Sequence, residues 1–172
     1  MKRILCLMMV CIATSAVANG ASLSDDDLLR IRFDQKLQAQ VSPALVFQDE
    51  TGKSVQLGDY FGKKPIILIP GYYGCPMLCT LVLNGAIDSF RRLKQDVGDG
   101  FDVVFVSIDP SETPALASAK KTNYLRQYGR GRPDGWHFLV GSQASINALT
   151  DEIGFRFLEL SFAGKSVGPV QA

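Results

Sequence analysis

Three segments rich in apolar residues predict β-strands, and the first of them is a continuous apolar run. They span residues 65–70, 101–108 and 136–140, and isoleucine is frequent in the first run and valine in the second. Strands with both faces covered carry such uninterrupted apolar sequences, because neither face meets water. We therefore expect these three segments to form the centre of a sheet.

Two shorter segments before the first run predict a β-hairpin. Residues 41–47 and 54–57 lie on either side of residues 49–52, whose sequence Asp-Glu-Thr-Gly is typical of a turn. Near the other end of the chain, residues 155–160 have an extended pattern. The hairpin would stand at the N-terminal side of the sheet.

Helical periodicity fills the intervals between the apolar runs. Apolar residues recur at spacings of three and four over residues 76–97, and the sequence Gly-Asp-Gly at 98–100 should end that helix. The apolar positions are Leu78, Val82, Ala86, Phe90, Leu93 and Val97. Thr113 and Pro114 predict the start of a second helix, because a hydroxyl caps the first turn and proline fits the first helical position. This helix should end near residue 128, before a glycine.

The alternation of strands and helices indicates an α/β fold with parallel strand pairs. A further helix expected over residues 142–153 continues the alternation. In open α/β sheets, ligand and reactive sites lie at the carboxyl ends of the strands. We therefore expect the functional site at that end of the sheet.

The N-terminus is typical of a secretory signal peptide. Lys2 and Arg3 supply the positive start, residues 4–17 are mostly apolar, and Ala-Val-Ala at 16–18 fits a cleavage site. An uncleaved membrane anchor is the alternative, and only in that case do we expect contact with a membrane. Export would place the protein in the periplasm or on the periplasmic face of the inner membrane.

The remaining chain predicts one domain. Residues 19–40 are polar and indicate a leader with a short helix at most, and residues 41–172 should form the domain. Loss of Lys2 and Arg3 with residues 1–18 would change the formal net charge of +1 to −1. A nearly neutral domain lacks the basic surface that nucleic acid requires, so nucleic acid is excluded as a partner.

The positions of the cysteines point to redox or metal chemistry. Cys6 and Cys11 belong to the predicted signal peptide, so the exported protein keeps Cys75 and Cys79. A disulfide between two such close residues removes little chain entropy and does not stabilise a fold. A close pair in an exported protein therefore indicates a redox or metal site.

The spacing of this pair favours a metal. Pro76 fits the first position of a helix, so Cys75 would lie near the helix N-terminus, where unpaired N–H groups favour a thiolate. Cys79 would follow one turn later, with Cβ atoms about 5–6 Å apart, whereas a relaxed disulfide needs roughly 3.8 Å. A metal with bonds to sulfur of about 2.3 Å spans this gap more easily. Two thiolates indicate copper or zinc, although two inert packed cysteines remain an alternative.

Six short segments of the chain carry a recognisable set of sequence motifs. They are residues 34–37, 57–62, 73–79, 106–114, 136–139 and 154–157, with the sequences DQKL, LGDYFG, YGCPMLC, VSIDPSETP, WHFL and GFRF. In these segments, and in their order, the chain resembles the Sco/SenC family of copper chaperones. Each segment alone is weak evidence, but together they are specific and cover about residues 34–157.

The resemblance implies a thioredoxin-like fold with a central mixed sheet flanked by helices. It also implies delivery of copper to the CuA site of cytochrome c oxidase, or reduction of the cysteines of that site. The partner would be the CuA subunit or another copper protein. The copper cysteines of the family correspond to Cys75 and Cys79, and its aspartate corresponds to Asp109. From its own chemistry, Asp109 could tune a metal site or form a turn.

The chain also departs from the family. The third copper ligand of the family, a histidine beyond the segment that ends at Phe157, has no counterpart, and the only histidine, His137, lies at a predicted strand start. We therefore expect a structural role for His137, and Cu(I) rather than Cu(II) as the ion. The last strands and closing helix of the family also lack counterparts. We expect a domain that is incomplete after about residue 157, with an unpaired sheet edge and exposed apolar surface.

Three functional hypotheses follow. The first is a copper chaperone that binds the ion through Cys75 and Cys79. The second is a thiol–disulfide oxidoreductase, in which Cys75 would attack and Cys79 would resolve the mixed disulfide. The third is an inactive fragment of the fold, so whether the protein is an enzyme is left open by the sequence.

Overall fold

The structure is a computed structural model that describes residues 25–74, 78–162 and 165–170. The predicted signal peptide lies outside these residues, as do Cys75, Pro76 and Met77. Within the described ranges, no helix is long and apolar enough to cross a membrane.

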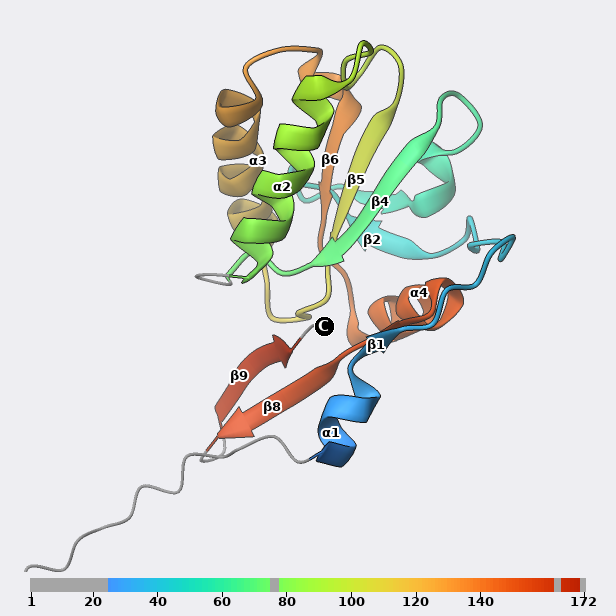
Figure 1. Cartoon of the computed structure of the whole chain (residues 1–172), viewed down its shortest axis with the longest axis vertical. Helices are drawn as coiled ribbons and strands as arrows, with labels where there is room; N and C mark the ends of the chain where they lie inside the picture. The colour runs from blue at the N-terminus through green and yellow to red at the C-terminus, as the bar shows by residue number, and fades with distance from the viewer. Residues whose placement is uncertain (1–24, 75–77, 163–164, 171–172) are drawn as a thin grey trace, which may run out of the picture.

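Three parallel strands form the central sheet (Figure 1). They are β4 (Ile66–Gly71), β5 (Asp102–Ser107) and β6 (Trp136–Leu139), in the order β4-β5-β6. The three strands coincide with the three apolar runs, so that prediction is confirmed. Residues 103–107 of β5, the middle strand, are all buried, because its apolar side chains lie in a core cluster on each face of the sheet.

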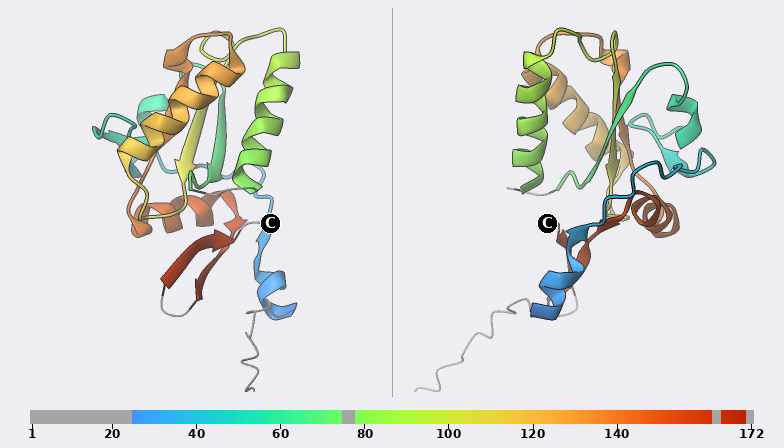
Figure 2. Two further views of the ribbon diagram at one scale, coloured as in Figure 1. Left: turned by 90° about the vertical axis from the view of Figure 1, so that its left-hand side faces the viewer. Right: turned by 45° about the vertical axis from the view of Figure 1, so that its right-hand side comes forward.

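Two helices cover one face of this sheet (Figure 2). α2 (Leu78–Arg92) connects β4 to β5, and α3 (Pro114–Tyr128) connects β5 to β6. α3 begins as predicted, because the Thr113 side chain accepts a hydrogen bond from the N–H of Leu116. The core between the helices and the sheet centres on a group of buried aromatic residues. These are Tyr73, Phe90, Phe101, Phe105, Tyr124, Tyr128, Trp136 and Phe138.

The predicted apolar face of α2 was wrong in part. Val82 and Leu93 are 54% and 47% exposed, whereas Leu83, Ile87 and Phe90 are buried. Helical periodicity identifies the helix, but two neighbouring stripes of this helix are apolar and only packing decides which one faces the sheet. α2 also ends at Arg92, so Val97 is buried beyond the helix.

A hairpin and a helix cover the opposite face of the sheet. β2 (Val46–Gln48) pairs with β3 (Ser54–Gln56), a short 3-10 helix η1 (Leu57–Tyr60) follows, and α4 (Gln143–Ile153) lies on the same side. The first strand of the hairpin was predicted over residues 41–47, but in the structure β2 is shorter and begins at Val46. Gln48 and Val140 form one isolated antiparallel bridge, but the hairpin is a separate sheet, so the central sheet is parallel rather than mixed as predicted.

The elements of the leader and the strand that pairs with it lie beyond the carboxyl ends of the central strands (Figure 1). α1 (Asp25–Arg30) is the short helix expected in the leader, and β1 (Arg32–Phe33) pairs with β7 (Phe155–Arg156). The leader is therefore attached to the domain. Another 3-10 helix, η2 (Pro133–Gly135), precedes β6.

The end of the described chain forms a hairpin. β8 (Leu158–Phe162) pairs with β9 (Lys165–Val170), and neither strand joins the central sheet. The small, polar sequence of the tail did not suggest a strand, so β9 is an addition to the prediction. It needs no buried face in order to pair with β8, because the backbone supplies the hydrogen bonds.

β4 occupies the edge of the central sheet rather than its centre. Its outer side has no strand partner among the described residues, and Ile66, Ile67 and Leu68 are only half-buried. The prediction of a strand buried on both faces was therefore wrong, because faces and edges are covered by different elements. The expectation of an unpaired sheet edge fits this arrangement.

Candidate functional site

The cysteine pair belongs to the connection between β4 and α2. β4 ends at Gly71, the loop of residues 72–74 follows, and α2 begins at Leu78, so residue 79 lies in its first turn. Cys75 and the side chain of Cys79 are outside the described part of the chain. The connection lies at the carboxyl end of β4, where the sequence placed it.

The carboxylate of Glu112 holds the loop that precedes Cys75. Its Oε2 accepts a hydrogen bond from the N–H of Tyr73 at 2.8 Å, and its Oε1 accepts one from the N–H of Gly74 at 2.5 Å. The hydroxyl of Ser107 donates to the same Oε2 at 2.6 Å. Both backbone amides before the first cysteine are therefore fixed to one side chain from the neighbouring β5–α3 connection.

Glu112 is half-buried, and this raises the pKa of its carboxyl group above the usual range. The hydrogen bonds from Ser107, Tyr73 and Gly74 oppose the effect of burial, because they stabilise the ionised form. The carboxylate is held by neutral donors, and no cation forms an ion pair with it in the described chain. In its ionised form, it brings negative charge to the side of the cysteine loop.

Tyr73 anchors the same loop to the core. Its side chain is 3% exposed, and its hydroxyl donates to the carbonyl of Leu139 at 2.9 Å and lies 3.3 Å from that of Phe105. The ring packs against Phe105 and Phe138, with centroids 5.1 and 5.8 Å apart. Burial raises the pKa of the phenol well above its usual value, so Tyr73 stays a neutral donor.

The side chain of Asp109 closes a turn. Its Oδ1 accepts hydrogen bonds from the N–H and the hydroxyl of Ser111, at 2.8 and 2.6 Å. Its own N–H donates to the hydroxyl of Ser107, which also bonds Glu112. The geometry favours the turn-forming interpretation, and a role of Asp109 toward copper stays a prediction.

His137 lies away from the cysteine connection. It is the second residue of β6, opposite Val104, and its ring centroid is 4.3 Å from that of Tyr60 on the face opposite α2. Burial lowers the pKa of the imidazole, and the charge of Lys121 lowers it further. These contacts agree with the structural role expected from the sequence.

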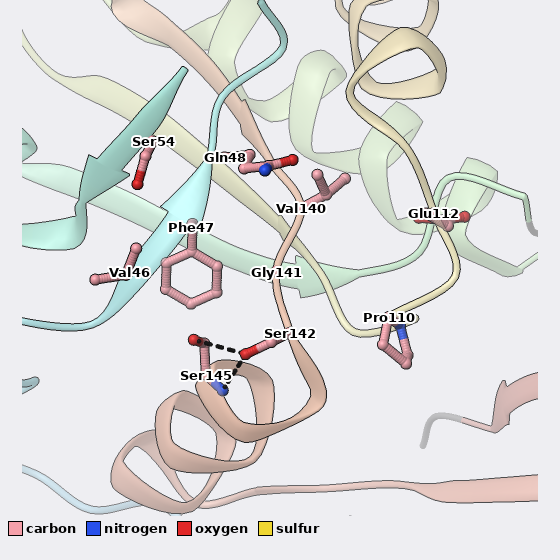
Figure 3. A pocket seen from close by; sticks show the side chains of 10 residues that line it. All are labelled: Val46, Phe47, Gln48, Ser54, Pro110, Glu112, Val140, Gly141, Ser142 and Ser145. Carbon is pink, nitrogen blue, oxygen red and sulfur yellow. Dashed lines mark hydrogen bonds between the residues drawn. The ribbon is translucent and has the colours of Figure 1, made fainter. Parts of the chain in front are cut away.

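A cavity of about 430 Å³ borders the Glu112 side chain (Figure 3). Its walls come from β2, from residues 110 and 112, and from the segment that leads into α4, where Ser142 caps the helix. Glu112 is one of the residues that line this cavity, and its side chain is half-buried. Among the residues that the structure describes, no group of three or more His, Cys, Asp or Glu could hold a metal.

Glu112 was not singled out by the sequence, although it lies in the VSIDPSETP segment. The available signal was its position: it directly precedes the Thr113 cap, just after the strand that neighbours β4. The carboxyl ends of adjacent parallel strands meet at one edge, so an acidic residue there lies near the cysteine loop. That inference needs the order of the strands, which the sequence does not supply.

Comparison with known proteins identifies the family. The sequence model of SCO1/SenC matches residues 33–160, which is most of the chain. The chain belongs to the SCO1/SenC family. No curated protein sequence matches it.

Solved structures have the same fold. A protein of Aquifex aeolicus VF5, described as a candidate electron transfer protein, is 25% identical, with a TM-score of 0.60 over 77% of this chain and 74% of that chain. Copper-bound ScoI of Bradyrhizobium japonicum is 22% identical, with a TM-score of 0.57 over 76% and 78%. BsSco, described as a cytochrome c oxidase assembly protein with a disulfide switch, is 22% identical, with a TM-score of 0.52 over 70% and 67%. The thioredoxin-like α/β fold expected from the sequence is confirmed.

Proposed function

We propose that this SCO1/SenC protein binds Cu(I) through Cys75 and Cys79 and delivers it as cargo during maturation of the CuA site of cytochrome c oxidase. The proposal rests on the loop of residues 72–74, which follows the carboxyl end of β4 and is fixed by hydrogen bonds. This loop leads directly into the cysteine pair, and the carboxylate of Glu112 and the core contacts of Tyr73 fix its course.

The donor chemistry supports copper. Two thiolates are soft ligands, and Cu(I) accepts such a pair without further donors. The nearest alternative nitrogen ligand would be His137, but it lies on β6 against Tyr60, on the face opposite α2. A Cu(II) site, which favours nitrogen ligands, therefore lacks support from the described residues.

The family supports the physiological role. ScoI of Bradyrhizobium japonicum was solved with copper bound, and BsSco belongs to the assembly proteins of cytochrome c oxidase. By analogy, the partner of this chain would be the CuA subunit or another copper protein. Delivery there requires export to the periplasm, through the signal peptide of residues 1–18, and residues 41–172 would act as one copper-carrying domain behind the leader of residues 19–40.

A thiol–disulfide oxidoreductase is the second candidate. It is favoured by the position of the pair at the start of α2, where the helix end lowers the pKa of a thiol, and by the disulfide switch described for BsSco. In that case Cys75 attacks a disulfide of the partner and Cys79 releases the reduced partner by forming the intramolecular disulfide.

Titration of the reduced protein with Cu(I) tests the first candidate. In competition with a chromophoric Cu(I) chelator, we expect one ion bound per chain, and no binding in the Cys75→Ser/Cys79→Ser variant. Equal binding by both proteins would refute the site. Absence of binding together with turnover in a disulfide-reduction assay would favour the oxidoreductase instead.

A further inference from the structure

The cavity beside Glu112 opens where the hairpin and the segment leading into α4 separate. Gln48 and Val140 exchange two backbone N–H to C=O hydrogen bonds, at 2.8 and 2.9 Å. An antiparallel ladder would continue with Val46 opposite Ser142, but the chain turns into α4 at Ser142 and the bridge stops at Val140 in the described chain. The cavity of about 430 Å³ lies in the gap that remains (Figure 3).

The backbone of Val46 places hydrogen-bonding groups at this gap. The carbonyl of Leu45 accepts a hydrogen bond from the N–H of Leu57 at 2.9 Å, so residues 45 and 47 are the ones that bond the facing chain. Successive residues of a strand bond to opposite sides, so the N–H and C=O of Val46 point away from β3, as those of Gln48 do. An extended peptide needs such a donor and acceptor in order to align with a strand.

The side chains around the gap are apolar except for a few polar groups and one carboxylate. Val46, Phe47, Pro110 and Val140 supply the apolar part, and Glu112 lies with Pro110 on the side opposite Phe47 (Figure 3). A lysine side chain has the same two parts, because its methylene stem is apolar and its head is cationic. The walls therefore fit a lysine better than a purely apolar or an acidic side chain.

The carboxylate of Glu112 has capacity for one further donor. A carboxylate offers about four acceptor positions, and the described contacts use two on Oε2 and one on Oε1. The nearby charge of Asp109 raises the pKa of Glu112, and no described cation forms an ion pair with it. An ammonium group would fill the last position on Oε1 and offset this negative charge.

The cavity is formed by parts of the chain that the structure describes completely. Its walls come from the hairpin, from the β5–α3 connection and from residues 140–145, all on the β6 side of the sheet. Neither the open edge of β4 nor any residue after 145 lines it. The site is therefore independent of whatever follows the β8–β9 hairpin.

We propose that this cavity receives an extended segment of the partner protein, whose backbone pairs with Val46 and whose lysine side chain donates to Oε1 of Glu112. The partner is the one named in the proposed function, for either of its two candidates, because an occupant of the cavity lies beside the loop that leads to Cys75. Glu112 also holds the amides of Tyr73 and Gly74, so docking of the partner and the course of the cysteine loop are coupled.

Short peptides test the site on the metal-free, reduced protein. The probe is acetyl-Ser-Lys-Ser-amide, compared with the same peptide carrying norleucine, which keeps the stem without the charge, or glutamate. We expect the amide signals of Val46 and Gly141 to shift in NMR spectra, and the lysine peptide to bind at least about fivefold more tightly than the norleucine peptide. Equal affinities, a preference for glutamate, absence of binding or shifts confined to another surface would each overturn the proposal.

Two pairs of variants show whether the cavity and Glu112 are responsible. In Glu112→Gln the advantage of lysine over norleucine should fall to within about twofold, whereas Glu152→Gln should keep it. Ser145→Leu narrows the cavity without changing Glu112 and should weaken binding of the lysine peptide at least about fivefold. Ala144→Leu is its matched control, because Ala144 lies on the same turn of α4, is exposed and does not line the cavity.

Equal effects of Ser145→Leu and Ala144→Leu would refute the cavity as the binding site. An undiminished preference for lysine in Glu112→Gln would refute the ion pair. Because no metal is present, these outcomes are separate from those of the Cu(I) titration: a protein that fails to bind copper but selects the lysine peptide would contradict the copper proposal alone.

Discussion

A single carboxylate, that of Glu112, connects the end of β5 to the loop before the cysteine pair. It accepts hydrogen bonds from two backbone amides and one hydroxyl. Hydrogen bonds to charged groups contribute about 1.5–3 kcal/mol each, more than bonds between neutral groups. The hydrogen bonds to Glu112 therefore restrain the loop of residues 72–74 more strongly than bonds between neutral groups would.

Replacement of Glu112 by Gln should weaken this hold. A carboxylate offers two acceptor oxygens, but the amide has one oxygen and an NH₂ group that would face a backbone N–H. We expect the affinity for Cu(I) to fall by about tenfold, because a positioning contact worth roughly 1.4 kcal/mol is lost. The measurement is a competition titration with a Cu(I) chelator, together with hydrogen exchange at Tyr73 and Gly74.

Glu152→Gln is the matched control for that substitution. Its carboxylate also accepts a hydrogen bond from a backbone amide, that of Ser42 at 2.8 Å, but on α4 rather than beside the cysteine loop. The control should leave Cu(I) affinity unchanged. Faster exchange at Tyr73 and Gly74 in Glu112→Gln, combined with an unchanged affinity, would show that the contact orders the loop without affecting copper.

His137 should make folding stability depend on pH. Its folded-state pKa is lower than the ordinary value of 6.5, first because of burial and then because of Lys121, while Glu50 acts in the opposite direction. The unfolded chain therefore binds more protons in this window, and stability is lost as the pH falls below about 6.5. His137→Phe keeps a ring against Tyr60 but cannot titrate.

Urea unfolding at pH 7 and pH 5 measures this effect. We expect the parent to lose more stability between the two conditions than His137→Phe does. Glu112 has a raised pKa and acts in the opposite direction, since its contribution is complete below its ordinary pKa and is lost as the pH rises. Both proteins share it, so it cancels in the comparison. Equal losses would mean that His137 titrates alike in the folded and unfolded chains.

Rules that involve only neighbouring residues predicted where helices begin and end better than which side of a helix is buried. Thr113, Pro114 and Gly129 define both ends of α3, because capping and positive φ are decided within a few residues. The face of α2 was not decided locally, since Val82 and Leu83 are adjacent and both apolar. The edge position of β4 and the contact of Glu112 with the loop depend on strand order, which involves residues far apart in sequence.

The connection of the leader to the domain depends on a glycine. Gly154 ends α4 with φ 74°, and its carbonyl accepts a hydrogen bond from the N–H of Asp34 at 2.7 Å. A Cβ at this position would lie 2.0 Å from the carbonyl oxygen of Asp34. A side chain there is therefore unfavourable both for its own backbone and for β1.

Gly154→Ala should accordingly destabilise the fold by at least about 2 kcal/mol, and Gly62→Ala by only about 1–2 kcal/mol. Gly62 shares the positive φ, at 81°, but has nothing near the added Cβ. Urea unfolding gives the free energies, and hydrogen exchange at Asp34 should increase only in Gly154→Ala. Similar free energies for both variants would indicate that β1 moves aside without cost.

For the whole molecule, the alternation of strands and helices was enough to predict the α/β class, and the family segments predicted the thioredoxin-like arrangement. The order of the strands decides the rest. It places the cysteine connection beside Glu112, leaves one side of β4 open, and puts His137 against Tyr60 on the other face. The β8–β9 hairpin lies outside this sheet, so its pairing is independent of the pattern that defines the core.

Thermal unfolding should show whether the fold prepares the cysteine pair for copper. A ligand that binds only the folded state stabilises it by about 2.7 kcal/mol at a free concentration one hundred times Kd. The unfolded chain still carries Cys75 and Cys79 three residues apart, and it would bind some Cu(I) itself. The gain therefore measures how much better the folded loop presents the two sulfurs. We expect Tm to rise by roughly 3–6 °C with Cu(I) in the reduced protein, less in Glu112→Gln, and not at all in Cys75→Ser/Cys79→Ser. If one ion binds per chain and Tm stays constant, the loop contacts of Glu112 and Tyr73 do not arrange the site.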